Sequence, residues 1–410
     1  MNAPRRFFLT AAAVSSLLAG VACSSAPQTE SLGQQSSPII KGTNSDASQD
    51  AVVLIIHYDP AAGSFGACTG TLLAPKLVLT ARHCVADTDE YAACDGDGTP
   101  LAAGVVKKNN KPETMYIFTG PNRPDFSRGD VSPAGRGAKI IDDGGKNLCN
   151  HDIALIVLKE PITDVPIAPV RLDDEVTVGE VVTSIGWGVT EKTIEPSVRQ
   201  QRSGVGVVAV GPDKNGRPPV PPNEFEVGES ICSGDSGGPA VAESGAVIGI
   251  VSRGGNSEPP DQNNPAKNCV DGLNLYTKLS PFKDVILGAY EAAEAEPWLE
   301  GQPDPRKATA GTACTDASEC RSNLCLSDPD QGGATTCAQD CAEVECPEGQ
   351  VCTAEGDVKV CRLPPGSRTK TVTTTSGCSA APASHGNASR CGLLLAVAAF
   401  GLAFVRRRRV

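Results

Sequence analysis

Short apolar stretches, each bounded by turn-forming residues, recur through the middle of this chain. They are rich in β-branched and aromatic side chains and end at Gly, Pro, Asn or Asp, which is typical of β-strands. The predicted strands are residues 51–58, 76–80, 115–119, 153–158, 181–185, 204–210, 246–251 and 273–278. No helical pattern alternates with them, so the sequence predicts an antiparallel all-β barrel or sandwich.

One helix is predicted after the last strand. Ser280 fits the N-cap and Pro281 the first helical position, and residues 282–295 contain no helix breaker except Gly288. Pro297 predicts the end of this helix.

Composition narrows the class of protein. The chain has 410 residues, with 43 Gly, 32 Pro and 17 Cys, and 36 basic against 48 acidic residues. This length predicts several folded units, and so many cysteines favour an oxidising, exported setting. The acidic excess provides no basic surface for a polyanion, which argues against nucleic-acid binding.

Residues 1–23 predict an export signal, because the basic Arg5 and Arg6 precede an apolar run and small residues. The arginine pair also resembles a twin-arginine export motif, and an ordinary signal with two positive charges is the alternative. The stretch around Cys23 resembles a bacterial lipobox, in which the thiol becomes lipidated, although Gly20 stands where leucine is usual.

Residues 378–410 predict surface sorting or anchoring. Cys378 is followed by a polar spacer, an apolar run over 392–405 and arginines at 406–409. This apolar run is shorter than the ~20 residues that a helix needs to cross a bilayer. The order of these features resembles the myxobacterial C-terminal surface-sorting signal, in which the chain is cut near the cysteine. A permanent C-terminal anchor is the alternative.

Cysteine spacing divides the rest of the chain. Six cysteines lie between residues 39 and 300, and eight more lie within residues 314–361. The intervening stretch is polar and contains prolines, as linkers do. We therefore predict a propeptide at 24–38, a main domain at 39–300, linkers at 301–313 and 362–377, and a disulfide-rich module at 314–361.

The module at 314–361 is too short to bury a useful core, so four disulfides are expected to hold it. It contains neither a histidine nor a Cys-x-x-Cys pair, which argues against a zinc site. We interpret its acidic charge as a solvated surface rather than a loose calcium site. The module is expected to be an extracellular spacer or recognition unit.

Residues 232–239 read Cys-Ser-Gly-Asp-Ser-Gly-Gly-Pro and place Ser236 in a glycine-rich turn. A serine hydroxyl acts as a nucleophile when it is exposed, has a base beside it and has amide donors for the developing oxyanion. Gly234 has no Cβ and allows a positive φ, so the amides of Gly234 and Ser236 can point to one place. Glycine-rich turns around serine are common, so the motif needs partners elsewhere in the chain.

The base must be one of four histidines. His385 lies in the C-terminal segment, and His57 lies in an apolar strand, where a structural imidazole is the ordinary expectation. His83 lies at the end of a strand, beside a cysteine, and His151 is the neighbour of Asp152. Asp152 begins a buried-looking strand, where a lone carboxylate is costly unless it is hydrogen-bonded, and pairing with His83 meets that need. The chain order His83, Asp152, Ser236 is that of serine hydrolases built on a double β-barrel.

These three motifs resemble those of trypsin/chymotrypsin-family serine endopeptidases, over about residues 39–290. The resemblance implies two six-stranded Greek-key β-barrels with a C-terminal helix and an active site between the barrels. It also implies that His83 is the general base and then acid, that Asp152 orients the imidazolium and that Ser236 attacks the scissile carbonyl. The amides of Gly234 and Ser236 would form the oxyanion hole.

The resemblance implies two disulfides and leaves a third by elimination. The expected pairs are Cys68–Cys84, Cys232–Cys269 and, without a matching family bridge, Cys94–Cys149.

The resemblance further predicts a zymogen. In the family, a new N-terminal ammonium pairs with the aspartate before the nucleophile, and Ile39 and Asp235 would take these parts. Because Pro38 precedes Ile39, a trypsin-like activator would not cut there, and another activating protease is expected. The alternative is that Ile39 starts the first strand and that activation is absent or different. Cleavage would leave a lipid on Cys23 with the propeptide.

Specificity is predicted to favour uncharged residues before the scissile bond. Ser230 stands where trypsin-like members carry an aspartate that selects Arg or Lys. Gly254 leaves one pocket wall open, and Asn274 stands near a position that is usually glycine. The neighbouring Glu229 complicates this inference. Arg82, where alanine is usual, is expected to point to solvent.

The sequence thus predicts an exported, surface-held serine endopeptidase whose partners are protein or peptide substrates, an activating protease, and the export and C-terminal sorting machinery. No cofactor or metal is expected, and the acidic run 95–97 is interpreted as a turn rather than a calcium loop. The alternative is a catalytically weak surface-binding protein on a protease scaffold that acts through the cysteine-rich module.

Overall fold

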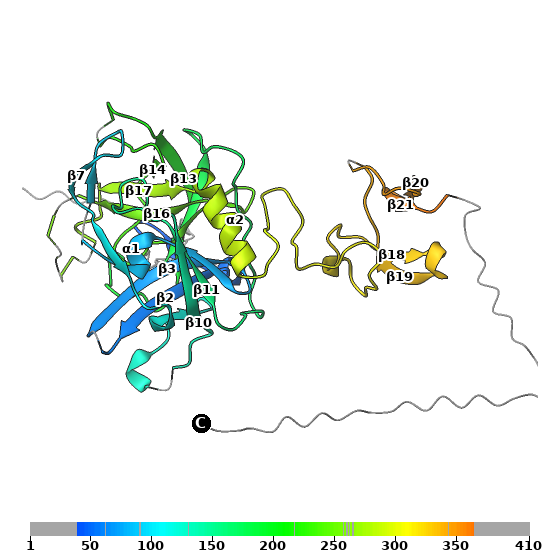
Figure 1. Cartoon of the computed structure of the whole chain (residues 1–410), viewed down its shortest axis with the longest axis horizontal. Coiled ribbons are helices and arrows are strands. Elements are labelled where there is room, and N and C mark those ends of the chain that lie inside the picture. The colour runs from blue at the N-terminus through cyan, green and yellow to red at the C-terminus, as the bar shows by residue number, and fades with distance from the viewer. Residues whose placement is uncertain are drawn as a thin grey trace, which may run out of the picture. The chain divides into compact units, whose positions relative to one another are not determined.

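The computed structural model describes residues 39–364, except positions 62, 90, 91, 130, 217, 257, 260, 262, 265 and 343 (Figure 1). The predicted export signal and propeptide, the lipidation site at Cys23 and the sorting site at Cys378 lie outside the described residues. The chain divides into two units, of which the first ends at Asp340 and the second begins at Cys341.

Six antiparallel strands form the first closed barrel. They are β2 (Val52–Asp59), β3 (Ser64–Ala74), β4 (Leu77–Thr80), β9 (Met115–Phe118), β10 (Gly135–Asp142) and β11 (Ala154–Leu158). Their order around the barrel is β10, β11, β4, β3, β2, β9. Alternate residues of these strands point inward, and fully buried side chains such as Leu72, Val78 and Ile156 fill the interior.

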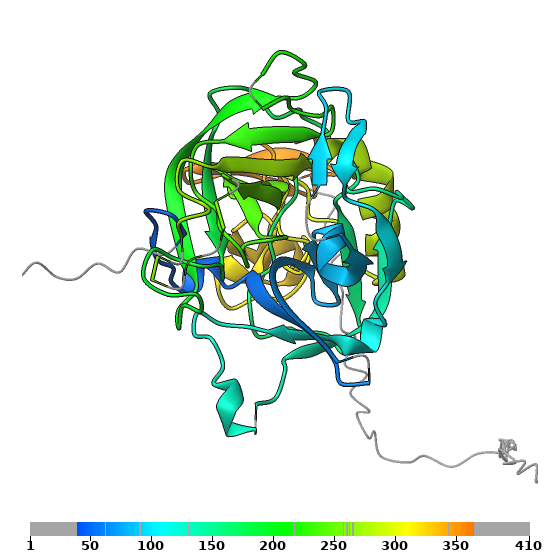
Figure 2. The ribbon, with the colours of Figure 1, turned by 90° about the vertical axis from the view of Figure 1, so that its left-hand side faces the viewer.

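The second barrel also closes with six strands. They are β12 (Val181–Gly186), β13 (Gln200–Val210), β14 (Glu224–Val227), β15 (Pro239–Ala242), β16 (Val247–Gly255) and β17 (Leu273–Lys278), and the short β1 (Thr43–Asn44) pairs with β13. The pairing of β13 with β14 completes the ring. Phe225 and Tyr276 stack in its core with ring centroids 5.4 Å apart. Figure 2 shows the blue and cyan first barrel beside the green second barrel, and the predicted fold class is confirmed.

The segment between β4 and β9 contains elements that the sequence pattern did not predict. They are α1 (Arg82–Val85), β5 (Ala86–Thr88), β6 (Ala92–Cys94), β7 (Pro100–Ala103) and β8 (Val106–Asn109). β5 pairs with β8, and β6 pairs with β7 to form a hairpin beyond them. These strands are only three or four residues long, too short to show a period-2 pattern in the sequence.

The C-terminal helix α2 (Lys283–Ala292) follows a 3-10 turn, Ser280–Phe282. The predicted N-cap at Ser280 is wrong, because Phe282 precedes the first residue of α2 and no side chain caps the helix. The Ser280 hydroxyl donates to Glu175 Oε1 at 3.0 Å and accepts no hydrogen bond from a helix amide. The predicted end at Pro297 is also wrong, because Glu294 has a φ of 56° and interrupts the helix earlier. Other 3-10 turns are Ala47–Gln49, Pro112–Thr114, Phe126–Arg128, Ala317–Glu319 and Pro329–Gln331.

The cysteine-rich region contains two disulfide-bonded hairpins. β18 (Cys325–Asp328) pairs with β19 (Ala334–Cys337), and β20 (Val351–Glu355) pairs with β21 (Val358–Arg362). In each set of four cysteines, the first bonds to the third and the second to the fourth. The bridges are Cys314–Cys325, Cys320–Cys337, Cys341–Cys352 and Cys346–Cys361. The region expected to be one module is therefore two similar disulfide units.

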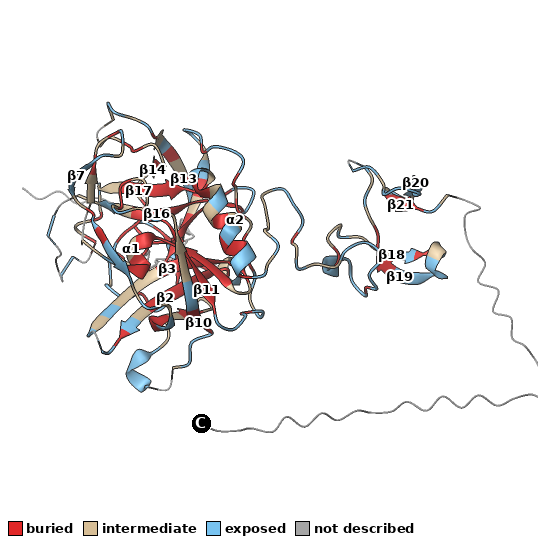
Figure 3. Ribbon diagram, viewed as in Figure 1, coloured by how far each residue is buried: buried red, intermediate tan, exposed pale blue. Residues whose placement is uncertain are grey.

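Burial differs between the barrels and these units (Figure 3). Buried residues run through both barrels, whereas those of the cysteine-rich region are mainly the cysteines and a few neighbours. The four expected disulfides are thus the main constraint on these units. Part of the predicted linker 301–313 packs with the disulfide unit of residues 314–337. The amide of Ala308 donates to the carbonyl of Glu319, and the amide of Gly311 donates to that of Cys337.

No helix in the part of the chain that the structure describes is long and apolar enough to cross a membrane.

Candidate active site

His83 lies on α1, a single helical turn that directly follows β4. The Cys68–Cys84 disulfide ties this turn to β3. The ring Nδ1 of His83 lies 2.9 Å from Oδ2 and 3.1 Å from Oδ1 of Asp152. The backbone N–H of His83 also donates to Asp152 Oδ1, at 3.0 Å. One carboxylate therefore fixes both the backbone position and the ring orientation of His83.

Asp152 precedes β11 and is 1% exposed. It accepts a further hydrogen bond from Ser252 Oγ, at 2.7 Å. Burial alone would raise the pKa of Asp152, but attraction to His83 and the hydrogen bonds from His83 and Ser252 outweigh it and lower this pKa. Burial would likewise lower the pKa of His83, but Asp152 raises it above its ordinary value. The pair thus favours an ionised Asp152 and stabilises an imidazolium at His83.

The sequence reasoning missed Ser252. This residue directly follows the predicted buried strand 246–251 and lies two residues before Gly254. A polar residue at the end of an apolar run was the available signal, but the sequence did not show that its hydroxyl would face Asp152.

Ser236 lies in the turn before β15, packed against β3 and β4. Gly237 has a φ of 77°, and an added Cβ there would lie 2.1 Å from Thr80 Oγ1 and 2.5 Å from Thr69 O. The amide of Thr69 donates to the carbonyl of Ser236 at 2.8 Å. Glycine is therefore needed beside Ser236, because only a residue without a side chain brings the turn this close to the first barrel.

The amides expected to form the oxyanion hole are available. Gly234 has a φ of 99°, and its carbonyl accepts a hydrogen bond from Thr69 Oγ1 at 3.0 Å. Among the described residues, no acceptor is bonded to the backbone N–H of Gly234 or of Ser236. Both donors therefore remain free for a ligand oxygen.

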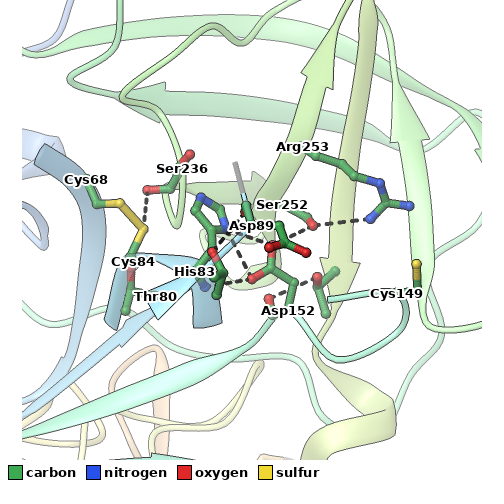
Figure 4. A network of polar contacts seen from close by, with 12 residues as sticks. Cys68, Thr80, His83, Cys84, Asp89, Cys149, Asp152, Ser236, Ser252 and Arg253 are labelled. Atoms are coloured by element: carbon green, nitrogen blue, oxygen red, sulfur yellow. Dashed lines mark hydrogen bonds and ion pairs between the residues drawn. A yellow bond between two sulfur atoms is a disulfide. The ribbon is translucent and has the colours of Figure 1, made fainter. Parts of the chain in front are cut away.

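His83, Asp152 and Ser236 line one cleft of about 740 Å³. Figure 4 shows the His83 ring between Asp152 and Ser236. Within the described residues, no hydrogen bond joins this ring to the Ser236 hydroxyl. Such contacts are often long in unliganded sites and tighten when substrate binds.

Asp235 is fully buried beside the Ser236 turn. Its carboxylate accepts from the amides of Gly188 at 2.7 Å and Cys232 at 2.9 Å. Gly186 and Gly188 leave room for it, since an added Cβ would lie 2.1 and 2.5 Å from its carboxylate atoms. Burial raises the pKa of Asp235 to about 7, and the two amides and Arg123 offset this only in part.

Ile39, the residue after the predicted cleavage point, is fully buried. The next residues are anchored to loops of the second barrel. The amide of Lys41 donates to Glu191 Oε1 at 2.7 Å, and Lys41 Nζ binds Glu229 Oε2 at 2.7 Å. Glu229 is therefore turned toward Lys41, away from the cleft.

Comparison with known proteins identifies the family. The family model described as Trypsin matches residues 39–286. The chain belongs to the trypsin family. It is accordingly a serine endopeptidase, a hydrolase that acts on protein or peptide substrates.

The similar trypsin-family proteins come from snakes and a bacterium. Snake venom serine protease KN6 from Trimeresurus stejnegeri is 30% identical over 237 residues, which cover 55% of this chain and 80% of that protein. Thrombin-like enzyme elegaxobin-2 from Protobothrops elegans is 27% identical and is covered to 98% by 62% of this chain. Trypsin from Saccharopolyspora erythraea is 23% identical over 54% of this chain and 85% of its own length.

Among solved structures, the mouse brain serine protease neuropsin resembles this chain with a TM-score of 0.42 and 21% identity. The match covers 61% of this chain and 99% of neuropsin.

Three disulfides occur in this trypsin-family domain, and they are Cys68–Cys84, Cys94–Cys149 and Cys232–Cys269, the pairs that the sequence predicts.

Only one of the three residues predicted to form the specificity pocket of this trypsin-family domain lines the cleft. Gly254 lines the cleft, whereas Ser230 and Asn274 lie buried behind its wall. Asn274 Oδ1 accepts from the amides of Ser230 and Ile231, both at 2.9 Å, and its Nδ2 donates to Gly272 O at 2.9 Å. The side chain of Asn274 is thus hydrogen-bonded to the backbone on either side of it and holds the segment of Ser230 in place.

Charged side chains at the cleft are neutralised by partners. Arg253, which the sequence analysis did not single out, binds the buried Glu224 through two contacts of 2.8 and 2.5 Å. The other described charged residues that line the cleft also have ionic partners: Asp89 with Lys107, Asp152 with His83, and Glu258 with Lys267. Among the described residues that line the cleft, every charged side chain therefore has an ionic partner.

Arg82 does not point to solvent as predicted. It is buried and forms an ion pair with Asp142 at the end of β10. Asn109 Nδ2 and the amide of Gly144 also donate to this carboxylate, at 3.0 and 2.8 Å. The prediction failed because a local motif does not show that a carboxylate from a distant strand faces the first residue of α1.

Proposed function

We propose that Ser236, His83 and Asp152 hydrolyse peptide bonds through an acyl-enzyme. His83 Nε2 takes the proton of Ser236 Oγ as this oxygen attacks the scissile carbonyl, and then gives it to the leaving amine. Asp152, held ionised, stabilises the imidazolium that forms between these steps. Water then attacks the acyl-enzyme, with His83 again as the base. The position of the His83 ring between a buried carboxylate and Ser236 supports this assignment.

The amides of Gly234 and Ser236 are the proposed oxyanion hole. Both are free donors in the turn that carries the nucleophile. Their hydrogen bonds strengthen as negative charge develops on the carbonyl oxygen, which lowers the barrier to attack.

Activation by cleavage before Ile39 is the proposed regulation. The new ammonium of Ile39 would pair with Asp235, a fully buried carboxylate whose pKa is raised by burial. Neutralising Asp235 would hold the turn of Gly234 in the conformation that presents its amide. The residue before the cleavage point, Pro38, calls for an activating protease that does not require a basic residue there.

A preference for uncharged residues before the scissile bond is the proposed specificity. Asn274 is hydrogen-bonded to the backbone of Ser230 behind the cleft wall, and the described charged residues that line the cleft are paired. A buried Arg or Lys of the substrate would find no counter-ion, and burying an unpaired charge is costly.

Export and surface attachment complete the proposal. The N-terminal signal, the disulfides and the similarity to venom proteases support export. Cys23 is the proposed lipidation site and Cys378 the proposed sorting site, with residues 39–300 as the protease domain. The export and C-terminal sorting machinery would be the corresponding partners.

Active-site labelling tests the catalytic proposal. Protein processed to begin at Ile39 is expected to react with a fluorophosphonate probe, with the label on the peptide that contains Ser236, and to cleave peptides from a diverse library. Ser236→Ala is expected to abolish both the labelling and the peptide cleavage. Heat-denatured protein is the control that measures non-specific labelling. Processed protein that neither labels nor cleaves would refute the triad. Surface binding that survives Ser236→Ala and disappears on deletion of residues 314–361 would favour the binding-protein alternative.

A further inference from the structure

The β6–β7 hairpin forms part of the wall of the cleft. It extends from the segment that follows the His83 turn, and Ala92, Ala93 and Cys94 of β6 line the cleft that contains Ser236. The catalytic steps proposed above give this hairpin no role. Its small side chains bring the backbone of β6 close to the cleft.

The hairpin is fixed to the segment that carries Asp152 at both ends of its strands. The Cys94–Cys149 disulfide joins β6 to a position three residues before Asp152. The amide of Leu148 donates to the carbonyl of Gly104 at 2.8 Å, beyond the other strand of the hairpin. A covalent bond and a backbone hydrogen bond therefore prevent the hairpin from moving independently of the catalytic site.

The tip of the hairpin reaches a loop of the second barrel. Asp97 forms an ion pair with Lys214, in the connection between β13 and β14. An added Cβ on Gly96 would lie 2.5 Å from the Cα of Lys214, so the two backbones are in contact there. Asp95 Oδ1 accepts from the amides of Asp97 and Thr99 and shapes this tip as a turn. The hairpin thus spans from the barrel of His83 to the second barrel, as its cyan ribbon beside the green loops shows (Figure 2).

Other residues that line the cleft are also constrained. Pro218 and Pro219 of the same second-barrel connection line the cleft, as do Arg253 and Gly254 near the end of β16. Prolines have a fixed φ, and Arg253 is held by its ion pair with Glu224. The hairpin and these residues are therefore each held by contacts outside the cleft.

We propose that the β6–β7 hairpin is a specificity-determining bridge that closes one side of the substrate cleft. It admits an extended, unfolded polypeptide whose side chain facing Ala93 is small, such as Gly, Ala or Ser. A bulky side chain at that substrate position would displace a hairpin fixed at both ends, and a rigid wall discriminates against the larger group. The inference rests on the proposed catalytic function of the same cleft.

Two changes to the hairpin test the inference, both in the full chain processed at Ile39. Cys94→Ser with Cys149→Ser releases the hairpin, and Cys346→Ser with Cys361→Ser, which removes a bridge in the second unit, is its control. Ala93→Phe narrows the cleft. Its control is Leu101→Phe, because Leu101 is an exposed residue of the other strand that is not paired with Ala93 and does not line the cleft.

The readouts are kcat/KM for peptides with Ala or Phe at each position flanking the scissile bond, hydrolysis of p-nitrophenyl acetate, and fluorophosphonate labelling. Releasing the hairpin is expected to raise the Phe/Ala ratio about tenfold at one position, and Ala93→Phe to lower peptide kcat/KM by about tenfold. Ester hydrolysis and labelling should persist in both.

An unchanged Phe/Ala ratio on release, or unchanged peptide cleavage by Ala93→Phe, would overturn the bridge. If the double cysteine variant does not fold, Ala93→Phe decides. If the unmodified enzyme neither hydrolyses the ester nor labels, the proposed function fails, and that outcome is distinct from failure of the bridge.

Discussion

Asp152 illustrates how single residues set the chemistry of this site. Its carboxylate is buried yet has three donors: the ring and the amide of His83, and the hydroxyl of Ser252. Hydrogen bonds to a buried charge are worth more than those between neutral groups, because the charge has lost its water. Ser252 therefore supports the ionised state on which the proposed role of His83 depends.

Ser252→Ala tests this support. Loss of one donor to a buried carboxylate is expected to raise the pKa of Asp152 and to lower the free energy of unfolding by about 2 kcal/mol. Urea denaturation measures the stability, and kcat/KM on a peptide should fall as well. Ser203→Ala is a control on the exposed part of β13 and should change neither. Equal stability of Ser252→Ala and the parent protein would contradict the prediction.

Asp235 predicts a pH dependence in the uncleaved chain. Its pKa of about 7 in the folded state lies above the ordinary value of an aspartate, so the folded protein binds an extra proton. The resulting stability is complete below pH about 4 and is lost as the pH rises through about 7. Asp235→Asn should flatten this decline in urea midpoints measured between these pH values, in a Ser236→Ala background that prevents self-cleavage.

The exposed Asp173→Asn serves as the control for Asp235→Asn and should retain the decline. If Asp235→Asn declines as steeply as its parent, the carboxylate does not titrate in this range.

At the scale of elements, β3 shows why a strand was missed. This strand pairs with β2 on one side and with β4 on the other, yet Gly66 and Gly70 interrupt its apolar pattern. Gly70 is required by packing, because an added Cβ would lie 2.7 Å from Ile55 Cδ1 and 2.8 Å from Val78 Cγ1. The absence of a side chain there is a consequence of neighbours that are distant in the sequence.

Gly70→Ala is expected to destabilise the barrel by about 1–3 kcal/mol through overpacking. Gly66→Ala, in the same strand, has no atom within 4 Å of the new Cβ and should be neutral or slightly stabilising. Chemical denaturation of both variants in the Ser236→Ala background provides the comparison. The packing argument fails if the two substitutions have the same effect.

The predicted strands that proved correct share a local signal. Residues 51–58, 153–158 and 273–278 are apolar or β-branched and closely match β2, β11 and β17. Such strands are buried through most of their length, so their apolar composition predicts them without knowledge of their neighbours. The polar or glycine-containing strands β3, β10 and β14 lack this apolar composition. Their conformation depends on the strands with which they pair.

At the scale of the whole molecule, two folding principles are joined in one chain. The barrels bury apolar cores, whereas the cysteine-rich units depend on crossed disulfides. Below about 40 residues a hydrophobic core seldom suffices without such covalent links. We therefore expect the stability of the cysteine-rich units and the activity of the protease domain to be separable.

Cys320→Ser with Cys337→Ser tests this separation. Removal of a native disulfide from so small a unit is expected to cost about 2–5 kcal/mol and to expose residues 314–340 to limited proteolysis. Fluorophosphonate labelling of the protease domain should persist. Mass spectrometry of the digests locates the cuts, and unchanged resistance in this region would show that the unit does not need the bridge.

Local patterns in the sequence were enough to predict the all-β class and the chain order of His83, Asp152 and Ser236. These features are encoded locally, in the period of apolar residues and in short motifs that shape a turn. The tertiary structure decided which groups meet across the chain: Ser252 with Asp152, Arg82 with Asp142, and Asn274 with Ser230. It also decided that the β6–β7 hairpin lies against the cleft. Contacts between distant strands depend on barrel closure and packing, which no local pattern of side chains records.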